Sequence, residues 1–283
     1  MRRVARHGEA TSGSAAALAH SREGEGSPLV FLHGLGASKA QARTAVAGIR
    51  DVERFTIDAP AHGESASSPV PLNFGSFARA VVDLLDTLDI ATAILGGISM
   101  GAGISLRIAR DFPDRVSALV LVRPAWTDRP ARPHLDIIAD IGEWVEVSGA
   151  DGARDRLRSD DRYQRMVEHE PLAAASVANA IESVAATGRP EVLQAMVESS
   201  PVDDLRELAE FHHPTLVIST ERDRLHPVRV AEAVAAALPN ATSMTGPPRY
   251  LEPTAHQEFL THAINSFVPV EHRRPARATG DRP

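Results

Sequence analysis

The stretch Gly97-Ile98-Ser99-Met100-Gly101 lies where the apolar run 93–95 gives way to a segment with helical spacing. A glycine-x-serine-x-glycine sequence between a strand and a helix is typical of a nucleophile elbow. Because the chain must reverse sharply there, we expect a strained backbone at Ser99 and close contacts that only Gly97 and Gly101 permit. The hydroxyl then projects from the end of the strand, and the first helical turn directs its N–H groups at the group that the serine attacks.

The composition is typical of a globular protein with a large core. At 283 residues the chain can form one large domain, or a core with an insertion. A formal charge of −7 argues against nucleic acid and against an anionic membrane surface as partners. The absence of cysteine excludes disulfides, thiolate metal sites and cysteine nucleophiles. Because no apolar stretch approaches membrane-spanning length, we expect a cytoplasmic protein.

Short apolar runs alternate with helical patterns along most of the chain. We predict strands at 28–32, 52–57, 93–98, 117–123, 215–219 and 241–245, and helices at 74–88, 101–112, 228–238 and 257–267. This alternation predicts an α/β fold with a mostly parallel, doubly wound sheet flanked by helices. Residues 1–20 add a predicted antiparallel hairpin.

The alternation stops between residues 125 and 202. Helical patterns punctuated by prolines replace the strand-like runs there. We interpret 125–202 as a helical lid inserted into a core formed by 1–124 and 203–270. Residues 271–283 are rich in arginine and proline without apolar periodicity, and we predict that they are disordered.

Three further segments follow predicted strands, where open α/β sheets place their functional groups. The segment His33-Gly34-Leu35-Gly36 follows the first buried strand, and its glycines allow backbone N–H groups to turn inward, as an oxyanion hole requires. The segment 58–65, DAPAHGES, follows the next strand. Asp223 follows the strand at 215–219 and is thereby placed at the carboxyl end of the sheet.

Taken together and in this order, HGLG, DAPAHGES, GISMG and TERDRLHP resemble the α/β-hydrolase superfamily over roughly residues 26–124 and 203–268. The resemblance implies a lid-containing, esterase-like serine hydrolase that requires no metal and no organic cofactor. It implies Ser99 as the nucleophile and Asp223 as the acid of a catalytic triad. It also implies that the backbone N–H groups of Leu35 and Met100 form the oxyanion hole.

The histidine of the triad is harder to place. Similar proteins usually carry it in a Gly-His segment just after the last strand, where this chain has GPPRYL at 246–251. Either the loop is lengthened and His256 is the base, or the base is lost and Tyr250 stands in its place. We favour His256, because a tyrosine is a poor base near neutral pH. Its position at the start of the last helix counts against it, since the positive end of the helix disfavours a proton.

Other residues could contact a substrate or serve the structure. Arg123 could bind a substrate carboxylate, although pairing with an acid of the lid is the favoured interpretation. His33 and His62 are interpreted as loop residues held by hydrogen bonds, and Asp223 could alternatively cap the helix that begins near 227. The candidate substrate contacts are His33, Gly34, Arg123, Trp126, Trp144 and Tyr250.

The resemblance implies hydrolysis of a carboxylic ester, thioester or lactone of a small to medium apolar substrate through an acyl-enzyme. Two other classes stay open: a cofactor-independent, non-hydrolytic member of the fold, such as an oxygenase, lyase or cyclase, and an inactive relative that binds a ligand. The intact GISMG segment and Asp223 favour the hydrolase, because holding a ligand requires neither. The expected partner is a small-molecule substrate. The sequence leaves open whether the protein forms a homo-oligomer.

Overall fold

The computed structural model describes residues 18–268, within which seven strands form one sheet in the order β1-β3-β2-β4-β5-β6-β7. β1 (His20–Glu23) runs antiparallel to β3 (Val52–Ile57), and every other neighbouring pair is parallel. The remaining strands are β2 (Ser27–Leu32), β4 (Ala93–Ile98), β5 (Val116–Val122), β6 (Thr215–Thr220) and β7 (Ala241–Gly246). Most of the predicted hairpin at 1–20 and the predicted disordered tail at 271–283 lie outside the described residues.

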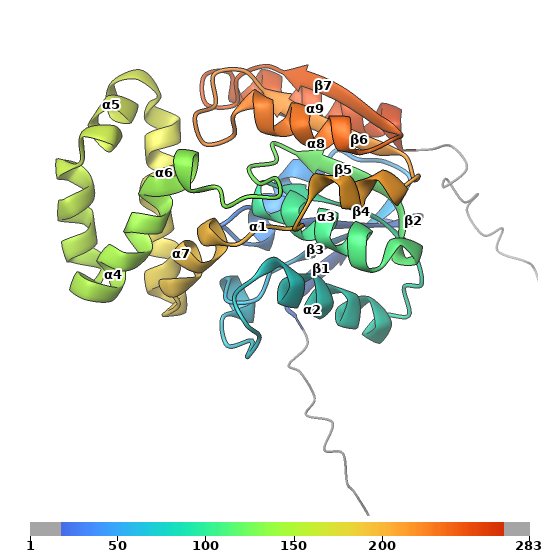
Figure 1. Ribbon diagram of the computed structural model, residues 1–283, viewed down its shortest axis with the longest axis horizontal. Helices are drawn as coiled ribbons and strands as arrows, with labels where there is room; N and C mark the ends of the chain where they lie inside the picture. Colours follow the sequence, from blue (N-terminus) through green and yellow to red (C-terminus); the bar gives the residue numbers. More distant parts are fainter. Residues whose placement is uncertain (1–17, 269–283) are drawn as a thin grey trace, which may run out of the picture.

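Helices cover both faces of the sheet (Figure 1). α1 (Lys39–Val46) and α9 (Pro253–Phe267) pack on one face, and α2 (Phe74–Thr87), α3 (Met100–Asp111) and α8 (Val228–Ala237) pack on the other. Along β2, Leu29 and Phe31 point into the first layer, whereas Val30 and Leu32 point into the second. The predicted α/β fold with a mostly parallel, doubly wound sheet is therefore confirmed. No helix within 18–268 has the length and apolar character needed to cross a membrane.

The six strands predicted from the sequence correspond to β2 through β7. β1 and α1 were not predicted, because both are short and carry little hydrophobic periodicity. β1 occupies the edge of the sheet, where a polar strand is tolerated because one of its sides faces solvent.

Residues 125–202 contain helices and no strand. They are α4 (Arg132–Ser159), α5 (Asp161–His169), α6 (Pro171–Thr187) and α7 (Glu191–Glu198). We call them the α4–α7 segment, and Figure 1 shows them gathered to one side of the sheet. α4 is interrupted at Gly149, whose φ is 67°. Apolar side chains of α4, α6 and α7, such as Ile141, Val177 and Leu193, are fully buried together. The role of the α4–α7 segment as a lid stays a prediction.

The turn from β4 into α3 holds the backbone of Ser99 at φ 55° and ψ −109°. The Ser99 N–H donates to the Val122 carbonyl at 2.9 Å, which ties the turn to the end of β5. A Cβ on Gly97 would lie 2.5 Å from the carbonyl carbon of Gly101, and a Cβ on Gly101 would lie 2.5 Å from the Leu32 carbonyl oxygen. Strand and helix can therefore touch only because both positions are glycine.

We expect Gly101→Ala to lower the free energy of unfolding by about 1–3 kcal/mol, because the added methyl group would collide with the backbone of β2. Urea denaturation followed by circular dichroism measures the loss. Gly75→Ala, in α2, is the matched control, because its Cβ would come no closer than 3.3 Å to any atom, the nearest being the flexible end of Arg107, and alanine favours the helix. An unchanged midpoint for Gly101→Ala would contradict the close contact at this turn.

Candidate functional site

Ser99 lines a small cavity of about 50 Å³ at the carboxyl end of β4. The walls come from the loop after β2, the ends of β4 and β5, the loops after β6 and β7, and helices α1, α4 and α6. Open α/β sheets place their ligands at this edge. The polar side chains in the wall are those of Gln41, Ser99, Arg123, Ser176, His226, Arg249 and Tyr250.

The loop after β2 lies against the serine. A Cβ on Gly34 would be 3.6 Å from the Cβ of Ser99, and the Gly34 N–H donates to Gln41 Oε1 at 2.8 Å. Among the described residues, the backbone N–H groups of Leu35 and Met100 make no hydrogen bond. The Met100 N–H is the first of α3, so it also carries the positive end of that helix. Leu35 thus lines the cavity together with Ser99, and Met100 follows Ser99 directly in the chain; their role as an oxyanion hole stays a prediction.

Asp223 follows β6, and its carboxylate is buried. It accepts hydrogen bonds from His226 Nδ1 at 2.9 Å and from Arg123 Nη1 at 2.9 Å. The Leu225 and His226 amides donate to the same carboxylate at 3.1 Å. Burial opposes its ionisation, but His226 and Arg123 outweigh burial and lower the pKa of Asp223. The ionised carboxylate therefore holds His226 with its proton on Nδ1.

The predicted pairing of Asp223 with His256 is not what the structure shows. His256 lies in the first turn of α9, and its Nδ1 donates to the Pro247 carbonyl at 3.3 Å. It does not line the Ser99 cavity. Burial, followed by the charges of Arg123 and Arg249, lowers the pKa of His256 to about 4. The acid that would hold its ring is occupied by another histidine.

That histidine is His226, which lines the same cavity as Ser99. It was missed because the expected base follows the last strand, whereas His226 follows the acid by three residues in one tight loop. Burial lowers the pKa of His226; Asp223 opposes this, and Arg123 and Arg249 add to it. The ring is therefore neutral near pH 7, with Nε2 unprotonated. Within the described residues, no hydrogen bond joins Ser99 Oγ to an imidazole.

Arg123 does not pair with an acid of the α4–α7 segment, contrary to the favoured interpretation. Its partner is Asp223, and both side chains are about 98% buried or more. Arg123 Nε is buried without a hydrogen-bond partner. Arg123 and Arg249 both lie over the ring of Tyr250, at 5.7 Å and 5.4 Å from its centroid. Within 18–268, Arg249 makes no ion pair. Arg249 was not among the predicted site residues, although it belongs to the GPPRYL segment.

Two of the candidate substrate contacts, Trp126 and Trp144, do not line the cavity. The Trp126 Nε1–H donates to the Met196 carbonyl at 3.1 Å, and the ring packs edge-on against Phe74 at 5.3 Å. Trp144 packs against the apolar core as a half-buried side chain. Both indole rings therefore contribute to packing, either between the α4–α7 segment and the rest of the protein or within the segment.

His33 also stays outside the cavity wall, because both of its ring nitrogens are used by the backbone. Nδ1 donates to the Gly34 carbonyl at 2.7 Å, and Nε2 accepts from the Ala59 N–H at 3.0 Å. His62 Nε2 accepts from the Gly36 N–H at 3.2 Å. The two rings therefore hold the loops after β2 and β3 together. Burial lowers the pKa of His33, and burial followed by the charge of His33 lowers the pKa of His62 to about 3.

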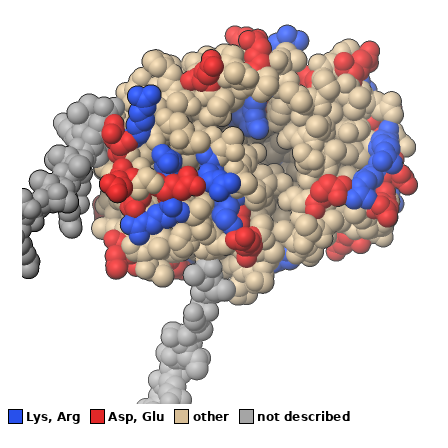
Figure 2. Space-filling view, turned by 180° about the vertical axis from the view of Figure 1, so that it is seen from behind, with Lys and Arg blue, Asp and Glu red and all other residues tan. Residues whose placement is uncertain are grey.

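An outer cleft of about 670 Å³ shares part of its wall with the Ser99 cavity. The shared residues are Leu35, Gln41, Ser176, Arg249 and Tyr250. α6 forms the other side of the cleft. On the face drawn in Figure 2, a hollow opens near the middle, and acidic and basic side chains lie to either side of it. Arg249 and Tyr250 therefore border both spaces.

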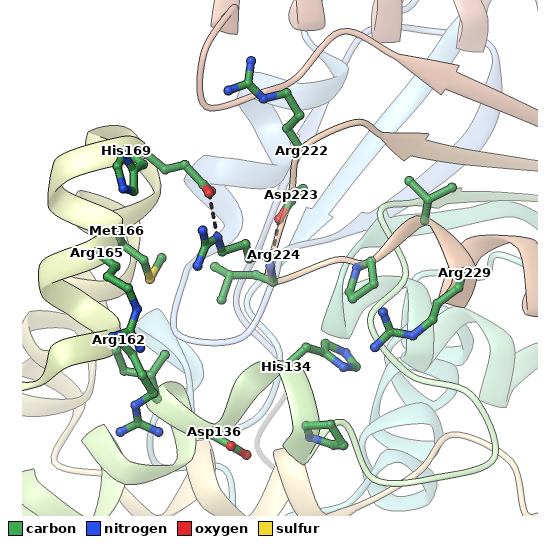
Figure 3. A pocket seen from close by; sticks show the side chains of 16 residues that line it. His134, Asp136, Arg162, Arg165, Met166, His169, Arg222, Asp223, Arg224 and Arg229 are labelled. Atoms are coloured by element: carbon green, nitrogen blue, oxygen red, sulfur yellow. Dashed lines mark hydrogen bonds and ion pairs between the residues drawn. The ribbon is translucent and has the colours of Figure 1, made fainter.

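A larger cavity of about 920 Å³ lies between α4, α5 and the loop after β6 (Figure 3). Its wall contains Asp223 but neither Ser99 nor His226. Of its arginines, Arg162 pairs with Asp140 and Asp160, and Arg224 pairs with Glu170. The candidate nucleophile Ser99 and the candidate base His226 thus line the smaller cavity and not the larger one. Residues 18–268 contain no cluster of three or more side chains suited to hold a metal ion.

Residues 27–247 match the family model described as the alpha/beta hydrolase fold. The chain belongs to this family. An uncharacterized hydrolase of Bacillus subtilis, YugF, is 24% identical over 258 residues, which are 85% of this chain and 89% of that protein. Three other curated relatives are matched over only 38%, 27% and 48% of their own length. The chain thus spans less than half of these relatives.

Solved structures show the same alpha/beta hydrolase fold. The enol-lactonase from Burkholderia xenovorans LB400 is 20% identical, with a TM-score of 0.71 over 89% of this chain and 96% of that one. A thermophilic esterase from Thermogutta terrifontis is 21% identical, with a TM-score of 0.69 over 89% and 92%. The likeness to these structures shows the fold of this chain.

The low pKa of His62 predicts a loss of stability at acidic pH. Its folded-state pKa, about 3, lies below the usual 6.5. Between pH 6 and 4 the unfolded chain therefore binds the proton that the folded chain does not, and stability falls as the pH falls. The free energy of unfolding should drop by about 1.4 kcal/mol per pH unit more steeply than in His62→Gln.

Urea titrations at pH 6, 5 and 4 measure both slopes. His262→Gln, at an exposed position of α9, is the control and should keep the wild-type slope. Parallel slopes for the wild type and His62→Gln would contradict a neutral, buried His62.

Proposed function

We propose that this protein is a serine hydrolase that cleaves a carboxylic ester, thioester or lactone, with Ser99 as nucleophile and His226 as general base. The observation that carries the proposal is the Asp223–His226 pair, held at 2.9 Å beside the cavity that Ser99 lines. In a catalytic triad the acid holds Nδ1–H so that Nε2 can take the nucleophile's proton. Asp223 imposes this tautomer on His226. The order Ser, Asp, His along the chain is retained.

The reaction then proceeds in two balanced halves. Ser99 Oγ bonds to the carbonyl carbon while its proton passes to His226 Nε2, and the bond to the leaving alcohol, or thiol, breaks as the imidazolium returns that proton to it. Water next gives a proton to His226 and attacks the acyl-enzyme. The bond between Ser99 Oγ and the acyl carbon breaks, which releases the acid and restores the hydroxyl.

The free amides of Leu35 and Met100 support this chemistry. Both lie next to Ser99 and are uncommitted among the described residues, so they can donate to the oxyanion that forms during attack. A donor of this kind contributes about 3–4 kcal/mol to the transition state in other hydrolases. Gln41 strengthens the arrangement, because its hydrogen bond to the Gly34 N–H fixes the loop that carries Leu35.

We propose His226 rather than His256 as the base. Pro247 stands directly after β7, where similar proteins carry the histidine, and His256 donates to its carbonyl instead of to an acid. A base needs an orienting partner as well as access to the nucleophile. His226 has the first in Asp223 and shares a cavity with Ser99. Hydrogen bonds at a catalytic serine can form only once substrate is bound, so their absence in the free protein does not oppose the proposal.

One observation favours a second candidate, a non-hydrolytic member of the fold. Pro247 follows β7 directly and thus occupies the position where similar proteins carry the base. A lyase, cyclase or oxygenase of this kind would bind its ligand in the same cavity without an acyl-enzyme. The two candidates differ in whether Ser99 forms a covalent adduct.

We expect a fluorophosphonate probe to label Ser99 covalently, because the oxyanion donors and His226 activate its hydroxyl. Peptide mapping by mass spectrometry locates the adduct. Ser99→Ala should abolish the label, and Ser176→Ala, at the other serine of the cavity wall, should retain it. A label on Ser176, or none in a folded sample that turns over p-nitrophenyl esters, would overturn the assignment.

The two histidines can be separated by mutation. His226→Ala should lower kcat/KM for a p-nitrophenyl ester by about a thousandfold or more, as loss of a triad base does elsewhere. His256→Ala should lower it less than tenfold, because the side-chain hydrogen bond that this ring makes goes to the Pro247 carbonyl and not to an acid. Thermal unfolding of each variant controls for loss of fold. The opposite order of the two effects would assign the base to His256.

A further inference from the structure

The cavity beside Ser99 holds more positive than negative charge. Arg123 and Arg249 both line it, whereas the carboxylate of Asp223 is the one acid that either guanidinium contacts among the described residues. His226 is neutral near pH 7 because burial lowers its pKa. The buried cluster therefore carries one uncompensated positive charge, which is costly in a site of low polarity.

The excess charge resides mainly on Arg249. This side chain is only partly exposed, and it makes no ion pair in the described part of the chain. Burial lowers the pKa of Arg249, and the neighbouring charge of Arg123 lowers it further. Its contact with the Tyr250 ring, at 5.4 Å, supplies a weak attraction and no counter-charge. The guanidinium is thus held beside the nucleophile without an anion.

Arg123 cannot share its counter-ion with Arg249, because its own side chain is short of acceptors. It is 2% exposed, and its Nε is buried without a hydrogen-bond partner although Nη1 bonds Asp223. An unsatisfied buried donor of a charged group is rare in folded proteins. An anion bound at Arg249 would balance the charge of the two arginines, of which Arg123 already has its carboxylate in Asp223.

We infer that the site binds a substrate that carries a carboxylate near its scissile ester. Arg249, which lines the outer cleft, binds this carboxylate. The inference rests on the proposed hydrolase and specifies its substrate class. Arg249 lines both the Ser99 cavity and the outer cleft, so a group held there lies a short way from the serine. A guanidinium fork matches a carboxylate in shape and charge. One carboxylate also balances the single excess charge, whereas a phosphate dianion would exceed it.

A matched pair of esters tests the inference. Monoethyl adipate and ethyl hexanoate have acyl chains of equal length, which end in a carboxylate and in a methyl group. The wild type should show the higher kcat/KM for monoethyl adipate, measured by pH-stat. In Arg249→Met the ratio of the two kcat/KM values should fall by about tenfold to a hundredfold, as expected when a charge-assisted pair is lost. Arg249→Lys should restore part of the ratio.

The control variant is Arg229→Met, which removes an exposed arginine from the separate, larger cavity and should leave the ratio unchanged. A wild type that prefers ethyl hexanoate, or a ratio unaltered in Arg249→Met, would overturn the inference. Calorimetric binding of monoethyl adipate to Ser99→Ala, which lacks the proposed nucleophile, separates this from the proposed function. Binding that is lost in Ser99→Ala/Arg249→Met supports the carboxylate site even if neither ester is hydrolysed, and absence of monoethyl adipate binding to Ser99→Ala counts against it.

Discussion

The reversal of the backbone at Ser99 is the constraint on which the rest of the site depends. A positive φ at a residue other than glycine costs about 1–3 kcal/mol and persists only where the surroundings hold it. Here the glycines on either side let α3 lie against β2 and β4, and the Val122 carbonyl fixes the Ser99 amide. The register aligns Ile98 with Val122 and Val122 with Ile218. Three neighbouring strands therefore end together, and the residues that follow them meet.

The contacts among the residues that follow these strands differ from the contacts expected from their order in the chain. Asp223 binds two positively charged or protonatable partners, His226 and Arg123, through one carboxylate. His226 gains its tautomer from this bond, whereas Arg123 takes up part of the carboxylate's negative charge. The same acid thus orients the ring and anchors a buried arginine at the end of β5. Removing the acid would leave that arginine buried and unpaired, so Asp223 serves the fold as well as the proposed chemistry.

Sequence patterns predicted the elements that have a clear hydrophobic periodicity and the residues that directly follow a strand. Six strands, Ser99 and the loop at Gly34 were found in this way, because burial on both faces of a parallel sheet leaves continuous apolar runs. α1 and β1 were not predicted, because they are short and carry little hydrophobic periodicity. His226 escaped for another reason: its contact with Asp223 depends on the backbone angles of a three-residue loop, which periodicity does not encode. The partner of Arg123 lies 100 residues away in the chain, and no local pattern identifies it.

The same cluster suggests why an anionic substrate would help its own cleavage. In a triad the acid stabilises the imidazolium that forms during attack. Here Arg123 and Arg249 oppose that stabilisation, since their charges lower the pKa of His226. A carboxylate bound at Arg249 would cancel part of this field at the moment when His226 takes the proton of Ser99. Binding energy would then appear in the transition state more than in the ground state, which raises kcat and not only affinity. Selectivity for carboxylate esters and the proton affinity of His226 would thus follow from one electrostatic balance.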